Sequence, residues 1–245
     1  MAYRLPDPAG KAQYVREKFD EIARVYDLFN DLITQGQHRH WKNVLVGRVA
    51  ASAKGWGVDL CCGTGDISAR LMRRLAPGGG VIALDFSRNM LRLATSRLRR
   101  EGDGKGSTRR LVLCGDAQRI PFHDGSLAFV SVGYGLRNLT DLEACLTEIH
   151  RVLAPGGLLA SLDVGKVRAP WLRPLADFYL FRVVPRIGRL LQPGQEMYDY
   201  LPYSTVDYPD AEALRKLMMA RGFGQVEVIE FIFGAAAIHL ARKAG

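Results

Sequence analysis

Long apolar segments are the first feature that this sequence of 245 residues lacks. No apolar run approaches the roughly 20 residues that a membrane-spanning helix needs, so we expect no transmembrane segment. The first ten residues, MAYRLPDPAG, also lack the apolar core of a secretory signal. The sequence therefore predicts a cytoplasmic protein, with peripheral contact at the inner face of a membrane left open.

Cysteine is scarce, with 4 residues in the chain, and none of them has the C-x-x-C spacing. Cys61 and Cys62 are adjacent, but no histidine or third cysteine stands near them, which makes a poor zinc site. Without a secretory signal, Cys61, Cys62, Cys114 and Cys145 are expected to be reduced thiols that pack in the interior. We expect no metal site.

Acidic residues are outnumbered, at 25 Asp and Glu against 34 Lys and Arg, so the net charge is +9 and the pI is about 9.6. This balance suits nucleic acid, an anionic membrane surface or an anionic substrate, and it does not distinguish among them. A solvated arginine-rich surface without a partner explains it equally well. Hydrophobic residues make up 48% of the chain, which is enough for a full core and excludes a disordered protein.

Short apolar runs alternate with helical segments through the middle of the chain, which is typical of a doubly wound α/β fold with a parallel sheet. The expected strands cover residues 55–62, 80–85, 109–117, 127–134 and 158–164. The expected helices cover residues 66–76, 87–102, 140–153 and 210–223. The final segment, QVEVIEFIFGAAAIHLARK, predicts two β-strands joined by a short turn and hence an antiparallel pair.

Two helix starts carry residues that favour capping. Ser87 begins the helical segment at 87–102 and is a good N-cap. Thr140 is followed three residues later by Glu143, which is the spacing of a capping box.

Two parts of the chain do not follow this alternation. Residues 1–54 are expected to form two helices, roughly 11–32 and 38–53, and residues 166–208 form an insertion after the fifth strand. We predict that both parts cap the carboxyl edge of the sheet, where open α/β sheets bind ligands. Residues 55–245 form the expected main domain around the insertion.

The stretch VDLCCGTGD at 58–66 joins an apolar strand to a helix through a glycine turn. Glycine lets a ligand approach the backbone, and the start of the helix offers free N–H groups. Gly63 and Gly65 provide G-x-G, but Ser68 occupies the third position of the dinucleotide fingerprint, which disfavours NAD. Asp85 ends the next expected strand, where a carboxylate suits the ribose hydroxyls of either NAD or S-adenosylmethionine.

Further elements follow in order. Asp116 ends the third expected strand, where it can face an adenine, and APGG at 154–157 separates a helix from the fifth strand. Together with the D-x-C-x-G-x-G run that begins at Asp59, this order resembles a class I S-adenosylmethionine-dependent methyltransferase. The resemblance implies a Rossmann-like seven-stranded sheet, parallel with an antiparallel last strand, with helices on both faces. Cys61 departs from the common pattern, which has glycine there, but cysteine is small enough for the loop to form.

Four further motifs narrow the resemblance: YDLFNDLITQGQHRHWK at 26–42, GLRNLTD at 135–141, VVPRIG at 183–188 and YDYLPYSTVDYPD at 198–210. They resemble signatures of the menaquinone/ubiquinone-biosynthesis C-methyltransferases over nearly the whole chain beyond its first ten residues. The resemblance implies methyl transfer from S-adenosylmethionine to a ring carbon of a polyprenylated quinol, most directly demethylmenaquinol. A ubiquinol precursor and demethylphylloquinol stay open as acceptors.

The same resemblance implies which residues contact the cofactor. Thr64, Asp85 and the pair Asp116–Ala117 match the family's contacts directly. Gly133 stands where the family often has serine, so only its backbone can serve. The predicted cofactor site is Asp59, Gly63, Thr64, Gly65, Asp85, Asp116, Ala117 and Gly133.

Methylation of a ring carbon needs the neighbouring hydroxyl to ionise, so the acceptor must be a reduced quinol. With a pKa near 10, as for tyrosine, only about one such hydroxyl in a thousand is ionised at neutral pH. Arg137 follows the fourth expected strand, where its guanidinium could stabilise the phenolate, or else pin its loop through a carboxylate. His38 is the candidate base because its pKa lies near neutrality; a role at the helix start is the alternative.

Four residues are predicted to line the quinol pocket: Tyr26, Asn138, Tyr198 and Tyr203. Flat aromatic faces suit a quinol ring, although core packing explains each tyrosine as well. Asn138 could instead cap or orient its own loop.

The segment at 171–191 is apolar and carries arginines at positions 173, 182, 186 and 189. It could lie on an anionic membrane leaflet. Pro174 and Pro185 interrupt a long regular face, which favours an ordinary cap helix instead. The oligomeric state, including a homo-oligomer, stays open.

Three other functions compete with quinol methylation. The positive charge suits an RNA methyltransferase, but the chain has no appended RNA-binding module, and its fourth strand leads into YGLRN, not an N-P-P-Y loop. We therefore expect no nucleic-acid partner. The missing third glycine disfavours an NAD oxidoreductase, and a non-catalytic nucleotide-binding regulator remains an alternative.

Overall fold

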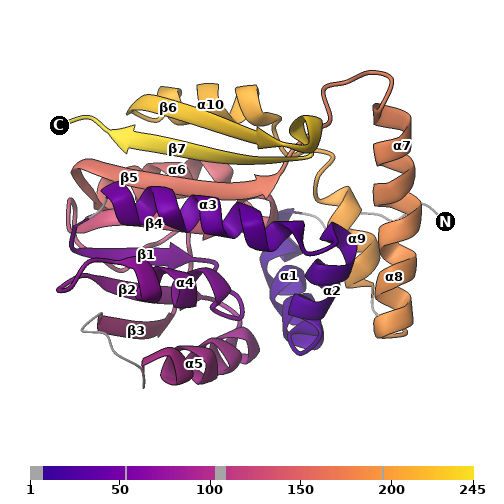
Figure 1. Ribbon diagram of the computed structural model, residues 1–245, viewed down its shortest axis with the longest axis horizontal. Helices are drawn as coiled ribbons and strands as arrows, with labels where there is room; N and C mark the ends of the chain where they lie inside the picture. Colours follow the sequence, from indigo (N-terminus) through magenta and orange to yellow (C-terminus); the bar gives the residue numbers. More distant parts are fainter. Residues whose placement is uncertain (1–7, 53, 103–108, 195) are drawn as a thin grey trace.

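The computed structural model describes residues 8–52, 54–102, 109–194 and 196–245. Within these residues, a seven-stranded sheet forms the centre of the molecule, in the order β3-β2-β1-β4-β5-β7-β6 (Figure 1). β7 runs antiparallel to both neighbours, and the other pairs are parallel, which confirms the predicted sheet. The strands are β1 (Trp56–Leu60), β2 (Gly80–Asp85), β3 (Arg109–Cys114), β4 (Leu127–Gly133), β5 (Leu153–Val164), β6 (Phe223–Phe231) and β7 (Ala236–Lys243).

Helices cover both faces of this sheet. Every residue of β2 is buried, and its alternate side chains enter two different hydrophobic clusters: Val81 and Ala83 one, Ile82 and Leu84 the other. A strand that is buried on both faces is the expected result for a parallel sheet between two helical layers. One layer holds α3 (Gln37–Ser52), α4 (Asp66–Arg74) and α5 (Arg88–Gly102); the other holds α6 (Leu142–Val152) and α10 (Ala211–Ala220).

A third hydrophobic cluster lies beside the carboxyl ends of the parallel strands, where two distant parts of the chain meet (Figure 1). One part comprises α1 (Pro8–Ile22) and α2 (Tyr26–Thr34). The other comprises α7 (Arg173–Phe178), the π-helical turn η2 (Tyr179–Val183), α8 (Val184–Leu191) and α9 (Met197–Tyr203). The fully buried residues of this cluster include Ile22, Phe29, Met197, Tyr198 and Tyr200. The cap therefore has its own small core.

The N-terminal helices differ from the expectation in two ways. The segment expected as one helix at 11–32 is two, because Val25 N donates to Ile22 O at 3.0 Å and forms a turn between α1 and α2. In addition, α3 packs on α4 and β5, so it covers a face of the sheet and not its carboxyl edge. Residues 1–7 and 53 of the predicted N-terminal unit lie outside the described residues.

One capping prediction is confirmed and one is wrong. Ser87 Oγ accepts from Met90 N at 3.1 Å at the start of α5, as expected. At the start of α6 the cap is Asp141, whose carboxylate accepts from Ala144 N at 2.9 Å. Thr140 does not cap, because its hydroxyl donates to Gln118 Oε1 at 2.8 Å.

The prolines of the insertion do not interrupt its helical path. Pro174 lies in the first turn of α7 and Pro185 in the first turn of α8, where the missing N–H is tolerated, and η2 joins the two helices directly. The π-helical turn directly before Pro185 nevertheless breaks the regular α-helical face, as predicted for that proline, whereas Pro174 sits at the helix start. Among the described residues, no helix combines the length and the apolar character needed to cross a membrane.

Candidate functional site

A pocket of about 290 Å³ lies at the carboxyl ends of β1, β2 and β4, under α1. It brings together predicted cofactor residues from the ends of four strands, β1 to β4. Predicted residues on its wall are Tyr26, Gly63, Asp85, Asp116, Ala117, Gly133 and Asn138. The carboxyl edge of the parallel strands is thus the place where the predicted site forms, as doubly wound folds require.

The turn after β1 depends on three left-handed residues, Cys61 at φ 52°, Gly63 at φ 54° and Gly65 at φ 78°. At Gly65 a Cβ would lie 2.9 Å from the Cβ of Ala94 in α5, so only glycine allows this approach. The left-handed backbone of Cys61 explains why the common pattern has glycine there. The thiol packs against Gly135, where a Cβ would lie 2.5 Å from the Cβ of Cys61.

Asp85 is buried at the end of β2 and holds the glycine turn in place. Its carboxylate accepts from Gly63 N at 2.8 Å and from Ser87 N at 2.9 Å. Burial raises the pKa of Asp85, although these backbone donors oppose the shift. Because a carboxylate has about four acceptor sites and the backbone occupies two, Asp85 retains acceptors for hydroxyl groups in the pocket.

Asp59 lies beneath the turn and outside the pocket wall. Ser68 Oγ and Ser131 Oγ donate to its two oxygens at 2.6 Å and 2.7 Å, tying α4 and β4 to β1. Burial raises the pKa of Asp59 to about 6, although the serine hydroxyls oppose the shift. Asp59, predicted as a cofactor residue, therefore supports the glycine turn from below and does not line the pocket.

The raised pKa of Asp59 predicts a pH-dependent stability. In the unfolded chain the pKa of Asp59 is near 3.9. The contribution of Asp59 to the stability of the fold is therefore fully present below pH 3.9 and is lost as the pH rises through the folded-state pKa of about 6. The difference of roughly two pKa units corresponds to about 3 kcal/mol. Urea unfolding of Asp59→Asn at pH 4.5 and pH 8 should show that the variant lacks this loss; parallel pH profiles for both proteins would contradict the assignment.

Three further cofactor candidates complete the wall. Asp116 and Ala117 follow β3 and line the pocket, and Asp116 also accepts from Gln118 N at 2.9 Å. At Gly133 a Cβ would lie 2.2 Å from Cδ1 of Ile67, so the serine that the family often carries would require the end of the isoleucine side chain to move.

Thr64 turns away from the pocket toward α2 and α5. Its hydroxyl donates to Asp27 Oδ1 at 2.8 Å and accepts from Arg97 Nη1 at 3.0 Å, and Asp27 also forms an ion pair with Arg97. Thr64 is not among the residues that line the pocket. The side chain therefore connects the glycine turn to the cap.

Helix α1 covers the pocket and was missed as part of the site. Its wall-forming side chains are Ala12, Val15, Arg16 and Phe19. The helix is held at both ends: Lys11 Nζ donates to Leu139 O at 2.6 Å, and Asp20 accepts from Ser87 Oγ and, at 3.2 Å, from Asn89 N. A ligand in this pocket would be enclosed by α1.

Removal of the Asp20 anchor should speed ligand release. Hydrogen bonds to a charged group contribute about 1.5–3 kcal/mol each, so Asp20→Ala should raise the dissociation rate of S-adenosylmethionine about tenfold or more. Stopped-flow displacement measures this rate. Glu17→Ala is the matched control, because Glu17 is exposed on the same helix and accepts from Gln13 on that helix at 2.8 Å. An equal effect of both variants would contradict the anchoring role.

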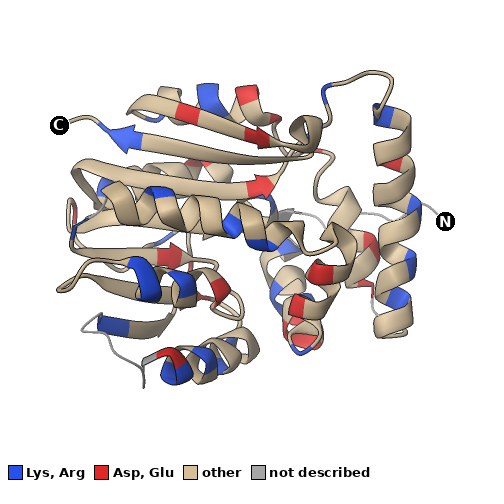
Figure 2. Cartoon of the chain, in the orientation of Figure 1, with Lys and Arg blue, Asp and Glu red and all other residues tan. Residues whose placement is uncertain are grey.

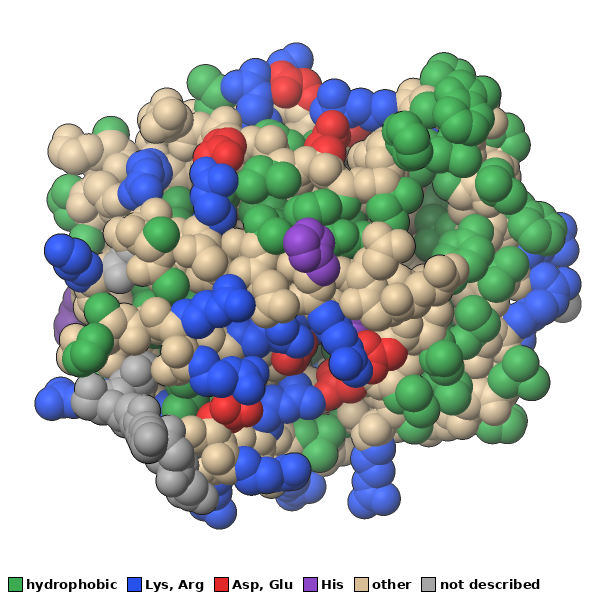
Figure 3. All heavy atoms as spheres, viewed as in Figure 1, with side chains coloured by type: hydrophobic (Ala, Val, Ile, Leu, Met, Phe, Trp, Pro, Cys, Tyr) green, Lys and Arg blue, Asp and Glu red, His purple; other side chains and the backbone are tan. Residues whose placement is uncertain are grey.

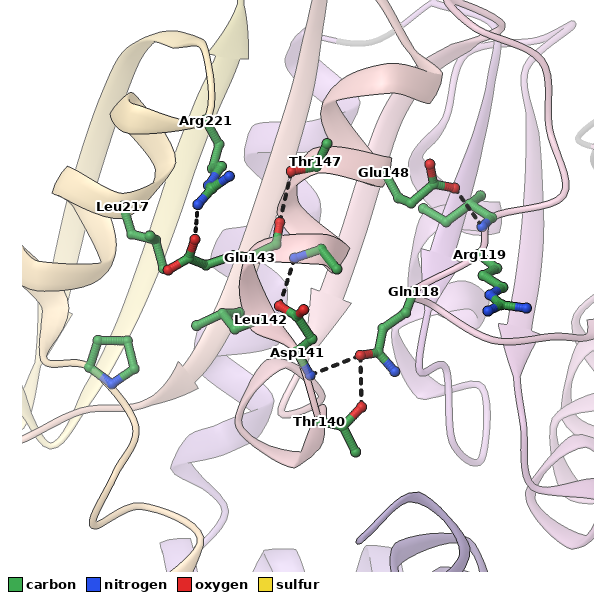
Figure 4. A pocket seen from close by; sticks show the side chains of 13 residues that line it. Gln118, Arg119, Thr140, Asp141, Leu142, Glu143, Thr147, Glu148, Leu217 and Arg221 are labelled. Carbon is green, nitrogen blue, oxygen red and sulfur yellow. Dashed lines mark hydrogen bonds and ion pairs between the residues drawn. The ribbon is translucent and has the colours of Figure 1, made fainter. Parts of the chain in front are cut away.

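A larger hollow of about 1120 Å³ adjoins this pocket, but it is an open groove between α6 and α10 (Figure 4). Gln118 and Thr140 line both spaces. Gln118 Oε1 accepts from Thr140 Oγ1 and Asp141 N, each at 2.8 Å, and so closes the wall between them. The smaller pocket is the better ligand site because it is more enclosed and holds the predicted carboxylates.

Arg137 lies in the short 3-10 helix η1 (Leu136–Asn138) and is buried beside Asp163, the penultimate residue of β5. The two side chains form an ion pair, and Arg137 N also donates to Asp163 Oδ2 at 3.4 Å. Burial is the largest single influence and lowers the pKa of Arg137, but Asp163 together with Tyr26 and Tyr200 raises it overall. The carboxylate that could pin this loop is therefore present, and sequence reasoning had not named it.

Two buried donors near this ion pair have no hydrogen-bond partner among the described residues, Arg137 Nε and Tyr134 Oη. The Arg137 guanidinium carbon lies 5.7 Å from the centre of the Tyr134 ring. Tyr134 also lines the pocket and has a left-handed backbone with φ 60°. Tyr134 lines the pocket and Arg137 does not, so of these two donors the Tyr134 hydroxyl is the one that a ligand oxygen or a water in the pocket could satisfy.

The four predicted quinol-pocket residues divide into two groups. Tyr26 and Asn138 line the pocket, and Asn138 accepts from Tyr200 Oη at 3.2 Å while it donates to Tyr134 O at 3.1 Å. Tyr198 is instead buried in the cap core against Phe29, with ring centres 4.8 Å apart. Tyr203 lies edge-on to Phe181 and does not line the pocket either.

His38 is not at the pocket. It is buried in the first turn of α3, where Nε2 lies 2.8 Å from Asp31 Oδ1. Burial and the charge of Lys42 lower the pKa of His38, although Asp31 opposes both. Asp31 also binds Arg39, whose hydrogen bonds lower the pKa of Asp31 to about 2. The geometry favours a structural role in joining α2 to α3.

Cys62 and Cys145 are buried and Cys61 is half-buried, as expected, but Cys114 is exposed at the end of β3, so the prediction that it packs in the interior was wrong. Burial raises the pKa of both Cys61 and Cys62 well above the ordinary thiol value, so the thiols stay protonated at neutral pH. Within the described ranges, no group of three or more potential metal ligands comes together.

The site joins a glycine turn at a helix start to carboxylates from two neighbouring strand ends, all at one sheet edge, and this defines a class I methyltransferase. A solved S-adenosylmethionine-dependent methyltransferase from Thermotoga maritima has the same fold, with a TM-score of 0.66, 19% identity and coverage of 93% of this chain and 99% of that one. The chain belongs to the ubiE/COQ5 methyltransferase family, whose model matches residues 8–243.

Two relatives extend the match over the full length. Demethylmenaquinone methyltransferase from Leptospira interrogans is 44% identical over 245 residues, which cover 98% of this chain and 97% of that protein. The ubiquinone/menaquinone biosynthesis C-methyltransferase UbiE from Xanthomonas axonopodis is 36% identical over 233 residues, with coverage of 95% and 91%. The predicted family is confirmed, and the chain is an S-adenosylmethionine-dependent methyltransferase.

Proposed function

We propose that this protein transfers the methyl group of S-adenosylmethionine to a ring carbon of a reduced polyprenyl quinone, with demethylmenaquinol as its acceptor. The observation that carries the proposal is one pocket lined both by Asp85 and by Tyr26 and Asn138, so that cofactor and aromatic acceptor can meet. The full-length relative from Leptospira interrogans, named demethylmenaquinone methyltransferase, supports this acceptor.

The cofactor half of the pocket fits a nucleoside. Asp85 accepts the ribose hydroxyls with its remaining acceptor sites, and Asp116 and Ala117 border the adenine. Phe86 and Met90 add an apolar wall beside them. The bound cofactor supplies an electrophilic methyl group. Gly63, Thr64 and Gly65 keep the turn close to it, and Asp59 supports the turn from below.

The acceptor half fits a flat ring with two oxygens. Tyr26 and Tyr134 supply aromatic faces, and the unpaired Tyr134 Oη is a donor for an acceptor oxygen. Arg137 does not line the pocket, and its guanidinium lies over the Tyr134 ring. Asn138, held by Tyr200, keeps the η1 loop in register with them. An acceptor oxygen beside Tyr134 would satisfy a buried donor that otherwise destabilises the fold.

Ionisation of the acceptor is the chemical problem that these residues solve. A phenolic hydroxyl with a pKa near 10 is only about one part in a thousand ionised at neutral pH. The buried charge of Arg137 acts in a low-dielectric setting, where it favours the phenolate more strongly than it would in water. The α1 cover keeps bulk water away from the ring.

The proposal is tested by comparing acceptors under anaerobic conditions. Reduced demethylmenaquinone should be methylated, its oxidised form should not, and the ubiquinone precursor should be a poorer substrate. Methylation of the ubiquinone precursor alone would change the acceptor within the same chemistry. No product from any reduced quinone, with S-adenosylmethionine bound, would overturn the proposal.

A further inference from the structure

Large apolar side chains gather on one exposed part of the cap. Trp171 is 75% exposed, Leu175 63% and Phe178 58%, and Phe233 in the short helix η3 (Ile232–Gly234) is 64% exposed. Figure 3 shows hydrophobic side chains gathered over this end of the molecule. Scattered exposed apolar residues need no explanation, but a contiguous group of large ones marks an interaction surface.

Exposed side chains follow one another at steps of three or four residues from the turn before α7 through α7, η2 and α8. Trp171, Leu175 and Phe178 come first, and the exposed Arg182 and Arg186 continue at steps of three or four residues. Positions at this spacing share one side of a helix. This exposed series is thus apolar from Trp171 to Phe178 and basic at Arg182 and Arg186. Figure 2 shows the basic positions along α7 and α8.

The turn between β6 and β7 adds to the apolar end. Ile232 and Phe233 both have left-handed backbones, at φ 47° and 54°, which bulky residues rarely adopt. Phe233 reaches the Trp171 ring, with ring centres 6.2 Å apart. A strained turn that exposes a phenylalanine is costly to folding, and such strain is often found at binding sites.

Backbone hydrogen bonds fix the turn to the start of the insertion. Arg168 N donates to Phe233 O at 3.0 Å, and Gly165 N donates to Ala235 O at 2.9 Å. Arg168 also pairs with Glu230 at 2.9 Å. The two apolar segments, 171–178 and 232–233, therefore form one rigid surface, although they lie more than fifty residues apart in the chain.

We propose that this surface, made by Trp171, Leu175, Phe178, Ile232 and Phe233 with the adjoining arginines, docks on an anionic lipid bilayer. Residues 166–194 carry six basic side chains and one acidic side chain, Asp177. Aromatic residues with neighbouring arginines suit the interface between acyl chains and anionic headgroups. A second copy of the chain would bring the same positive charge to the contact, which disfavours self-association here. The choice of a bilayer also rests on the proposed function, because a polyprenyl acceptor resides in one.

Tryptophan fluorescence tests the contact directly. Trp41 is buried and Trp56 is half-buried, so a change on adding vesicles reports on Trp171. Vesicles of phosphatidylcholine mixed with phosphatidylglycerol should shift the emission to shorter wavelength, and brominated lipid should quench it. The Trp171→Phe variant should lose both signals. No shift and no quenching at saturating lipid would overturn the proposal.

Co-sedimentation with the same vesicles separates the two halves of the surface. The Trp171→Ser, Phe233→Ser double variant should bind at least tenfold more weakly. The Arg173→Gln, Arg182→Gln, Arg186→Gln triple variant should also lose at least tenfold, since each basic residue near an anionic surface contributes about fivefold. The matched control removes the same charge from exposed positions on α5, Arg88→Gln, Arg99→Gln, Arg100→Gln, and should bind normally.

The remaining outcomes distinguish a lipid bilayer from a second copy of the chain as the partner of this surface. An equal loss in the α5 control would mean that only net charge matters, and it would overturn a specific surface. A concentration-dependent dimer that the Trp171→Ser, Phe233→Ser variant abolishes would assign the surface to a second copy. Vesicle binding does not require methyl transfer, so normal vesicle binding without quinol methylation would contradict the proposed acceptor and leave this surface intact.

Discussion

Replacement of Arg137 by methionine is expected to destabilise the folded protein by about 3–5 kcal/mol, because it leaves the buried carboxylate of Asp163 without its partner. In a protein of this size such a loss lowers the melting temperature by roughly 6–20 °C. Thermal or urea unfolding without cofactor measures it. The loss arises from stranding a charge, so it is larger than the net contribution of the ion pair itself.

The matched variant adds Asp163→Asn to Arg137→Met. Asparagine removes the unpaired charge. It keeps a side-chain oxygen that can accept from Val164 N, as Asp163 Oδ1 does at 2.9 Å. The double variant should recover at least half of the lost stability while it stays inactive, because the cation over the acceptor is still missing. Wild-type stability in Arg137→Met, or a further loss in the double variant, would show that the pair does not hold the η1 loop.

Replacement of Asp85 by alanine should weaken the binding of S-adenosylmethionine by at least about a hundredfold, since two hydrogen bonds to an ionised acceptor are worth roughly 1.5–3 kcal/mol each. The same change releases Gly63 N and Ser87 N, which shape the turn. Titration calorimetry measures the affinity, and cofactor-induced thermal stabilisation should disappear. Because burial raises the pKa of Asp85, wild-type affinity should also fall as the pH is lowered toward that raised value.

Asp124→Ala is the control for this change, because Asp124 is exposed and pairs with Arg151 at 2.7 Å, outside the pocket. It should bind the cofactor normally. Binding by Asp85→Ala within threefold of wild type, in a variant that melts normally without cofactor, would place the ribose elsewhere.

Local patterns predicted much of the central sheet. The strand at 80–85 was predicted with the bounds that β2 has, and Ser87 caps α5, because apolar runs and capping residues act over a few neighbours. The start of β5 was not found: it pairs already at Leu153, before the Pro-Gly-Gly sequence, through an irregular register with β4. That pairing depends on a strand more than twenty residues away.

Features that depend on distant contacts were missed. The sequence predicted one helix over residues 11–32 because no local signal interrupts the pattern at 23–25. The two helices that replace it are held by distant contacts, of Asp20 with Ser87 at the start of α5 and of Asp27 with Arg97 within α5. Thr140 and Asp141 are both able to cap, and the contact of Thr140 with Gln118 decides between them. An acid at the end of a fifth strand was a signal for Asp163, but its pairing with Arg137 required the fold.

The role of α1 shows the same limit at the site. The carboxylates at the strand ends could be placed from the sequence, since the parallel sheet brings these ends together. Ala12, Val15 and Phe19 carry no motif of their own, and their place over the pocket follows from anchors at Lys11 and Asp20.

The most direct measurement of the central claim follows an isotope-labelled methyl group from S-adenosylmethionine under anaerobic conditions, with reduced demethylmenaquinone as acceptor. The account predicts label on a ring carbon of the quinol with the wild-type protein and little with Asp85→Ala at the same cofactor concentration. Saturation with the cofactor, and yet no label in the quinol, would contradict it.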